Sequence, residues 1–111
     1  MDNARRKELA RAYREQKTRQ GIFAVRCAAT GDVWVAAAPD LDKRQNGLWF
    51  QLRMGGFPGR ALQQAWNAHG EPAFAFEVLE EISDENAGLI PLRLKEREAH
   101  WRDTLGAAAL I

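Results

Sequence analysis

The stretch GIFAVRCAATGDVWVAA, residues 21–37, constrains the fold of this chain more than any other segment. Phe23, Val25 and Cys27 alternate with other side chains in its first half, and DVWVAAA alternates in the same way in its second half. The intervening ATGD carries a glycine of the kind that tight hairpin turns require. The pattern predicts an antiparallel β-hairpin in which Cys27 is a small, buried strand residue.

Helical periodicity places further elements on both sides of that hairpin. Good helix formers after Asp2 predict a helix over residues 2–17. Later helical patterns cover DLDKRQNGLWFQLRM, GRALQQAWNAHG and residues 92–105, whereas FAFEVLEEI alternates like a strand. Ser83 is expected to cap another helical stretch, which Pro91 then interrupts. The order α-β-β-α-α-β-α predicts an α+β domain, a small three-stranded antiparallel sheet flanked by helices.

Composition excludes several classes of protein. The chain has 111 residues, 46% hydrophobic and 28% charged, which suits one globular domain. No apolar run is long enough for a membrane span, and the single cysteine excludes a disulfide framework. Without a secretory signal, we expect a cytoplasmic protein. We divide the chain into an N-terminal basic helix (1–20), a domain (21–105) and a short apolar tail (106–111).

The charges are unevenly distributed along the chain. Residues 1–26 contain eight Lys or Arg against three Asp or Glu, and Lys7, Arg11 and Arg14 share one face of the predicted helix. The acidic block consists of Glu71, Glu77, Glu80, Glu81, Asp84 and Glu85. A basic helix face can contact the phosphates of nucleic acid. Its attraction to the acidic block of the same chain is an equally good interpretation.

One carboxylate disagrees with the helix face on which it lies. Leu94, Trp101 and Leu105 form an apolar stripe on the last helix, and Glu98 lies in the middle of it. Arg44 lies at the edge of an apolar stripe on an earlier helix. One interpretation, which the spacing favours, is a structural ion pair between Glu98 and Arg44. The other is a phosphate site in which Glu98 holds a divalent cation and Arg44 neutralises phosphoryl oxygens.

Several motifs resemble, in order and spacing, the GIY-YIG endonuclease domain, especially its homing-endonuclease type. They are GIF, WVA, DLDKR, FQLRMGGFP, LQQAWNAHG, FEVLEEI and KEREAHW, and they span residues 21–105. The resemblance implies a small antiparallel sheet flanked by helices and an enzyme that cuts nucleic acid phosphodiesters. It also implies that Glu98 is the carboxylate that binds one Mg²⁺ or Mn²⁺ ion, and that Arg44 stabilises the charge on the phosphorane.

Other catalytic positions of the family carry different residues here. Phe23 replaces the tyrosine of GIY, Trp34 replaces the tyrosine of YIG, and Leu48 replaces a supporting histidine. Phe57, Pro58 and Gly59 replace the family's His-Pro-Asn, and its late asparagine has no counterpart. Phenylalanine neither donates nor accepts a proton, and tryptophan only donates. Loss of one positioned base lowers the rate on the order of 10²–10⁴-fold.

We therefore expect a GIY-YIG-like domain with an eroded active site, which does not cleave or cleaves only weakly. It would bind DNA without sequence preference through backbone phosphates, using Lys7, Arg11, Arg14 and Arg44. The first alternative is an active, atypical endonuclease that uses Glu98 and Arg44 with Mg²⁺ or Mn²⁺. The second alternative is a protein-interaction module that does not bind nucleic acid.

Overall fold

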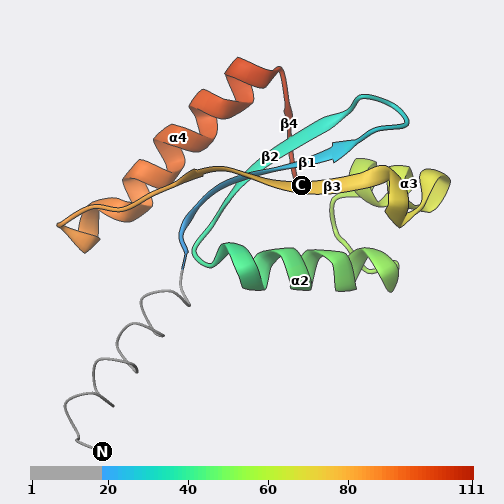
Figure 1. The fold of residues 1–111 in the computed structure, drawn as a ribbon, viewed down its shortest axis with the longest axis horizontal. Helices are drawn as coiled ribbons and strands as arrows, with labels where there is room; N and C mark the ends of the chain where they lie inside the picture. Colours follow the sequence, from blue (N-terminus) through green and yellow to red (C-terminus); the bar gives the residue numbers. More distant parts are fainter. Residues whose placement is uncertain (1–18) are drawn as a thin grey trace, which may run out of the picture.

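The structure is a computed structural model, and it describes residues 19–111. The predicted N-terminal helix and its basic residues Lys7, Arg11 and Arg14 lie outside the described residues. The described elements, shown in Figure 1, are β1 (Gly21–Cys27), β2 (Val33–Ala38), α2 (Leu41–Arg53), α3 (Arg60–His69), η1 (Glu71–Ala73), β3 (Phe74–Glu81), η2 (Ala87–Leu89), α4 (Ile90–Leu105) and β4 (Ala108–Ala109).

The sheet has four strands in the order β3-β1-β2-β4. Strand β1 is antiparallel to both β2 and β3, as the hairpin pattern predicts. Strand β4 is parallel to β2 and pairs Ala108 with Trp34. The predicted α+β class is confirmed, but the prediction of three antiparallel strands is wrong. The apolar tail supplies the fourth strand because Gly106, with φ of 60°, reverses the chain after α4.

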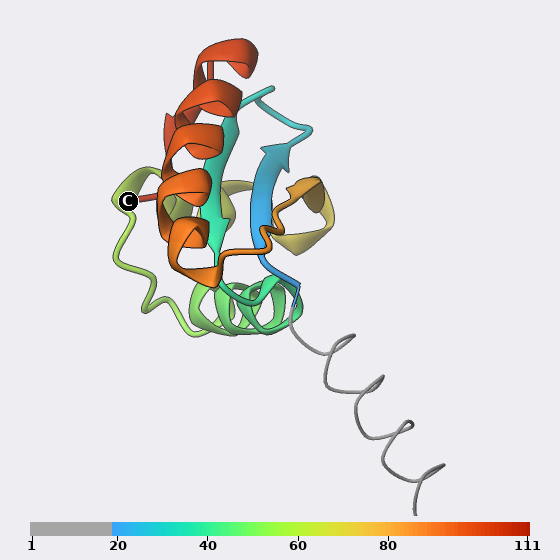
Figure 2. The ribbon, with the colours of Figure 1, turned by 90° about the vertical axis from the view of Figure 1, so that its left-hand side faces the viewer.

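Helices cover both faces of the sheet (Figures 1 and 2). Phe23 and Val25 pack with α2 and α3 in the larger core cluster, whereas Ile22 and Ala24 pack on the other face. That second face is covered by Leu94, Trp101 and Leu105 of α4. Alternate residues of β1 therefore point to opposite faces of the sheet, and both faces are buried because a helix layer covers each.

A very close approach between β1 and β3 explains the glycine that begins β1. A Cβ atom at Gly21 would lie 2.0 Å from the carbonyl oxygen of Glu80. Next to this contact the register shifts: Ile22 faces Glu80 and Phe23 faces Val78, so Leu79 is an extra residue in β3. This β-bulge bends the strand. It also places both Leu79 and Glu80 against α4.

The segment before α4 differs from its prediction. Residues 83–86 are not helical, so the prediction that Ser83 caps a helix is wrong. Asn86 takes that role, and its side chain accepts a hydrogen bond from the Gly88 amide at 3.0 Å in η2. Helix α4 then begins at Ile90 with Pro91 in its first turn. Proline is tolerated there because first-turn N–H groups have no acceptor within the helix.

Within residues 19–111, no helix combines the length and the apolar character that crossing a lipid bilayer requires.

Candidate functional site

Arg44 and Glu98, the two candidate site residues on helical stripes, do not form an ion pair in the structure. They lie on α2 and α4, which pack on opposite faces of the sheet. The Glu98 carboxylate contacts the guanidinium of Arg102, one helical turn further on, at 3.5 Å. Among the described residues, no carboxylate lies within ion-pair distance of Arg44, which is half-buried. The predicted pair between the two helices is therefore wrong, because Glu98 satisfies its charge on its own helix.

Phe23, Trp34 and Leu48 are all buried in one apolar cluster. Phe23 and Leu48 are 0% exposed, and Trp34 is 4% exposed. The ring of Phe23 stacks on Phe76, with 4.6 Å between centroids and 14° between planes. Trp34 stacks less closely on Phe74, at 6.5 Å. Apolar side chains of this cluster surround Phe23 and Leu48.

The segment at residues 57–59 supports the C-terminal tail. A Cβ atom at Gly59 would lie 2.2 Å from the carbonyl oxygen of Leu110, so only glycine lets the tail pass. Leu110 is buried in the larger core cluster beside Phe57. Gln63 holds the segment in place: its side chain accepts from the Phe57 amide and donates to the Leu52 carbonyl, each at 3.1 Å. No local sequence signal indicated Leu110 or Gln63, because both act through contacts with distant segments.

Arginines neutralise most of the acidic block. The ion pairs are Arg53–Glu71 at 2.6 Å, Arg26–Glu77 at 2.7 Å, Arg97–Glu80 at 2.8 Å, Arg19–Glu81 at 2.6 Å and Arg93–Asp84 at 3.3 Å. The partners come from several different elements, and most of these side chains are largely exposed. The suggested contact between the acidic block and the N-terminal helix lies outside the described residues.

Glu80 is the member of the acidic block that contacts two side chains of α4. Burial raises the pKa of its carboxyl, but hydrogen bonds from the Trp101 indole at 2.9 Å and Arg97 at 2.8 Å outweigh burial and lower that pKa. Glu80 therefore stays ionised at neutral pH. It ties β3 to α4 on the face of the sheet opposite Phe23.

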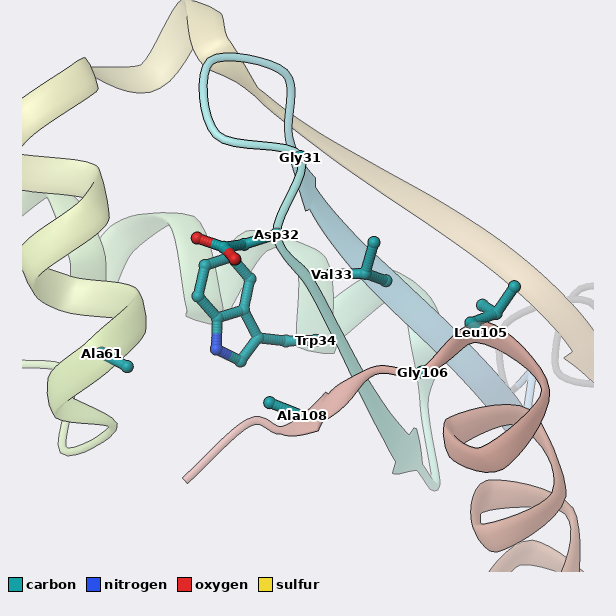
Figure 3. A pocket seen from close by; sticks show the side chains of 8 residues that line it. All are labelled: Gly31, Asp32, Val33, Trp34, Ala61, Leu105, Gly106 and Ala108. Atoms are coloured by element: carbon teal, nitrogen blue, oxygen red, sulfur yellow. The ribbon is translucent and has the colours of Figure 1, made fainter.

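A hollow of about 330 Å³ lies beside Trp34 (Figure 3). Its walls are the end of the hairpin loop, α3, the end of α4 and β4; the lining residues are Gly31, Asp32, Val33, Trp34, Ala61, Leu105, Gly106 and Ala108. Arg44 and Glu98 are not among them. Of Phe23, Trp34, Arg44, Leu48 and Glu98, only Trp34 borders this hollow.

Two solved structures have the same fold as this chain. The catalytic domain of the homing endonuclease I-TevI matches with a TM-score of 0.67 and 29% identity, over 78% of this chain and 88% of that one. A mutant of the catalytic domain of the intron endonuclease I-TevI matches with a TM-score of 0.68 and 28% identity, over 79% of this chain and 84% of that one. This is a GIY-YIG-like domain. No family model matches the sequence, and no curated protein matches it either.

The GIY-YIG resemblance inferred from the motifs is therefore confirmed at the level of the fold. The match covers most of this domain and most of each solved chain. The fold alone does not assign an activity, because function depends on the residues at the site.

The described residues offer few ligands for the divalent metal ion that a GIY-YIG nuclease implies. Within residues 19–111, no three His, Cys, Asp or Glu side chains come together as a metal-binding group. Glu98 is a single carboxylate, and one of its oxygens faces Arg102. Mg²⁺ is usually held by one or two carboxylates together with water and substrate phosphates. The described residues therefore offer one carboxylate, Glu98, and leave the other positions around an ion to water and substrate phosphates.

Proposed function

We propose that this GIY-YIG-like domain binds nucleic acid through the phosphate backbone and does not cleave it by the family mechanism. One observation carries the proposal: Phe23, Trp34 and Leu48, at the positions of two family tyrosines and a histidine, belong to one buried apolar cluster. Such packing favours a stable core over a hydrated site for a metal and a phosphate.

Proton transfer supports the same conclusion. A general base must lie within hydrogen-bond reach of the water it activates. The side chain of Phe23 is fully buried against Phe76 and carries no polar atom. Trp34 can donate a hydrogen bond but cannot accept a proton. A nuclease using these positions would have lost its relay, and each lost base lowers the rate on the order of 10²–10⁴-fold.

Arg44 supports the binding half of the proposal. Arg19, Arg26, Arg53, Arg93 and Arg97 all pair with members of the acidic block, whereas Arg44 has no carboxylate partner among the described residues. An arginine without a carboxylate partner is free to bind a phosphate in bidentate geometry. With Lys7, Arg11 and Arg14 of the N-terminal segment, it would give binding to DNA that is independent of sequence and weakens with salt.

The test combines plasmid nicking with gel retardation, at low salt, in Mg²⁺ and in Mn²⁺. Wild type is compared with Arg44→Ala, Glu98→Ala and a matched control, Lys43→Ala, which removes a neighbouring exposed charge on the same helix. We expect no nicking, and retardation that falls with salt. Retardation should weaken more in Arg44→Ala than in Lys43→Ala. Absence of both nicking and retardation would contradict the proposal and favour a protein-interaction module.

An active, metal-dependent endonuclease is the second candidate, and one observation favours it. The contact of Glu98 with Arg102 is long, at 3.5 Å, and the Glu98 side chain is 26% exposed, so a cation could displace the arginine. Waters and substrate phosphates would then have to complete the coordination of that ion. Nicking that Glu98→Ala and Arg44→Ala both abolish would establish this candidate and overturn the proposal.

A further inference from the structure

The hollow beside Trp34 has the size of a small-molecule site. Its volume, about 330 Å³, falls at the lower end of the range of roughly 300–1,000 Å³ that ligand pockets occupy. Ala61, Gly106 and Ala108 contribute little side-chain bulk to its walls (Figure 3). The open volume is therefore flanked by small residues from three separate elements.

A hydrogen-bond donor of an otherwise buried side chain opens into this hollow. Trp34 is 4% exposed, and no residue in 19–111 accepts a hydrogen bond from its indole Nε1–H. Figure 3 shows that nitrogen directed at the space between Ala61 and Ala108. Every buried side-chain nitrogen among the described residues has a hydrogen-bond partner. The Trp34 nitrogen has none, so solvent reaches it through the hollow, whereas the Trp101 indole donates to Glu80 at 2.9 Å. A ligand acceptor in the hollow would give Trp34 the partner that Trp101 already has.

A carboxylate lies on the same side of the strand. Asp32 is two residues before Trp34, so the two side chains project the same way, and Val33 projects the other way in Figure 3. Oδ2 of Asp32 accepts a hydrogen bond from the Thr30 hydroxyl at 2.8 Å. Its Oδ1 accepts none from the described part of the chain. The lining of the hollow thus includes one donor, on Trp34, and one charged acceptor, on Asp32.

This pair of groups selects for a particular ligand chemistry. The Asp32 carboxylate repels phosphates and carboxylates. Phe74 lies against the Trp34 ring, so a ligand meets the edge of the indole and does not stack on its face. The matching partner is a flat, uncharged ring whose edge carries an acceptor beside donors. Guanine meets this requirement, because its O6 acceptor adjoins the N1–H and N2 amino donors.

We propose that this hollow binds a guanine base by its hydrogen-bonding edge. Trp34 Nε1–H donates to O6, and Asp32 accepts from N1–H and the amino group. The inference goes beyond the proposed binding of phosphates and does not depend on it, because guanosine carries no phosphate. A free nucleoside and an unpaired guanine in a strand offer the same edge.

The experiment follows the indole N–H resonances of the ¹⁵N-labelled full chain during titration with guanosine. Loss of one resonance in Trp34→Phe assigns the Trp34 signal. We expect a saturable shift of that signal in the millimolar range. Inosine, which lacks the amino group, and the variant Asp32→Asn should each weaken binding about tenfold, the loss expected for a hydrogen bond to a charged group.

Two substitutions on α3 show whether the ligand occupies the hollow. Ala61→Leu fills the hollow and should abolish the shift, whereas Ala68→Leu, also at an exposed alanine of α3 but outside the lining, should leave it unchanged. An oligonucleotide with a single guanine among thymines should shift the signal more than an all-thymine one if an unpaired base in a strand is also a ligand. A missing guanosine shift, or one that survives both Ala61→Leu and Asp32→Asn, would overturn the proposal.

Discussion

The two faces of the sheet are packed by different kinds of side chain. The face toward α2 and α3 is filled by rings: Phe23 stacks on Phe76, and Trp49 and Trp66 meet edge to face at 5.4 Å. The face toward α4 buries smaller side chains and keeps one carboxylate, Glu80, held by Trp101 and Arg97. Phe23 and Leu48 thus serve packing on one face, whereas hydrogen bonds and an ion pair fasten α4 to the other.

The largest effect should come from removing a ring from the aromatic face. Phe23→Ala should lower the free energy of unfolding by about 3–5 kcal/mol, since it deletes a fully buried ring and leaves a cavity. Urea or thermal denaturation measures this loss. Phe50→Ala is the matched control, because Phe50 is 62% exposed and should cost little. Equal losses in the two variants would contradict the picture of a ring-filled face.

On the face toward α4, Glu80→Ala should destabilise the fold by about 1–3 kcal/mol. It would leave the partly buried donors of Trp101 and Arg97 without their acceptor. Glu96→Ala, an exposed acidic residue of α4, is the control and should be nearly neutral. If Glu80→Ala were as mild as the control, α4 would be held by apolar contacts alone.

Low pH should weaken the face toward α4, because Glu80 is the charged group held there. The pKa of Glu80 is lowered from its ordinary value of 4.5, so its contribution is fully present above pH 4.5 and is lost as pH falls through the lower native value. Unfolding free energy measured between about pH 5 and pH 2 should therefore fall less in Glu80→Gln than in wild type. Parallel pH profiles for the two proteins would contradict this assignment.

The smallest effect is expected at Glu98. Its exposed pair with Arg102, at i and i+4, contributes about 0.3–0.5 kcal/mol at most. Glu98→Gln should shift the unfolding free energy by no more than this, with Glu96→Gln as reference. A clear gain in stability on substitution would mean that Glu98 is held in an unfavourable place, as residues of binding sites often are.

Local pattern predicted much of the fold, and it failed where distant segments meet. The hairpin, α2, α3 and β3 follow from alternation, periodicity and glycine stops, because those signals act over a few residues. Ser83 misled the prediction because Asn86 and Pro91 offered a later helix start. β4 was missed because two alanines carry no strand signal until β2 lies beside them.

The candidate site was predictable in its list of residues but not in its geometry. Motif spacing located Arg44, Glu98, Phe23, Trp34 and Leu48. An apolar stripe shows which side of a helix is buried, but not on which face of the sheet that helix packs. The expected pair of Arg44 with Glu98 was therefore wrong, because the sheet lies between α2 and α4. The burial of Phe23 and Leu48 depends on rings contributed by β3, which begins 51 residues after Phe23 in the chain.

The short pairing of β4 with β2 has a consequence for solubility. Without it, β2 would present a row of free backbone N–H and C=O groups to other chains, and such open edges promote aggregation. The tail is anchored by Leu110, whose carbonyl fits against Gly59. The six residues after α4 thus cover this edge of the sheet, and their removal would leave β2 open to pairing with strands of other chains.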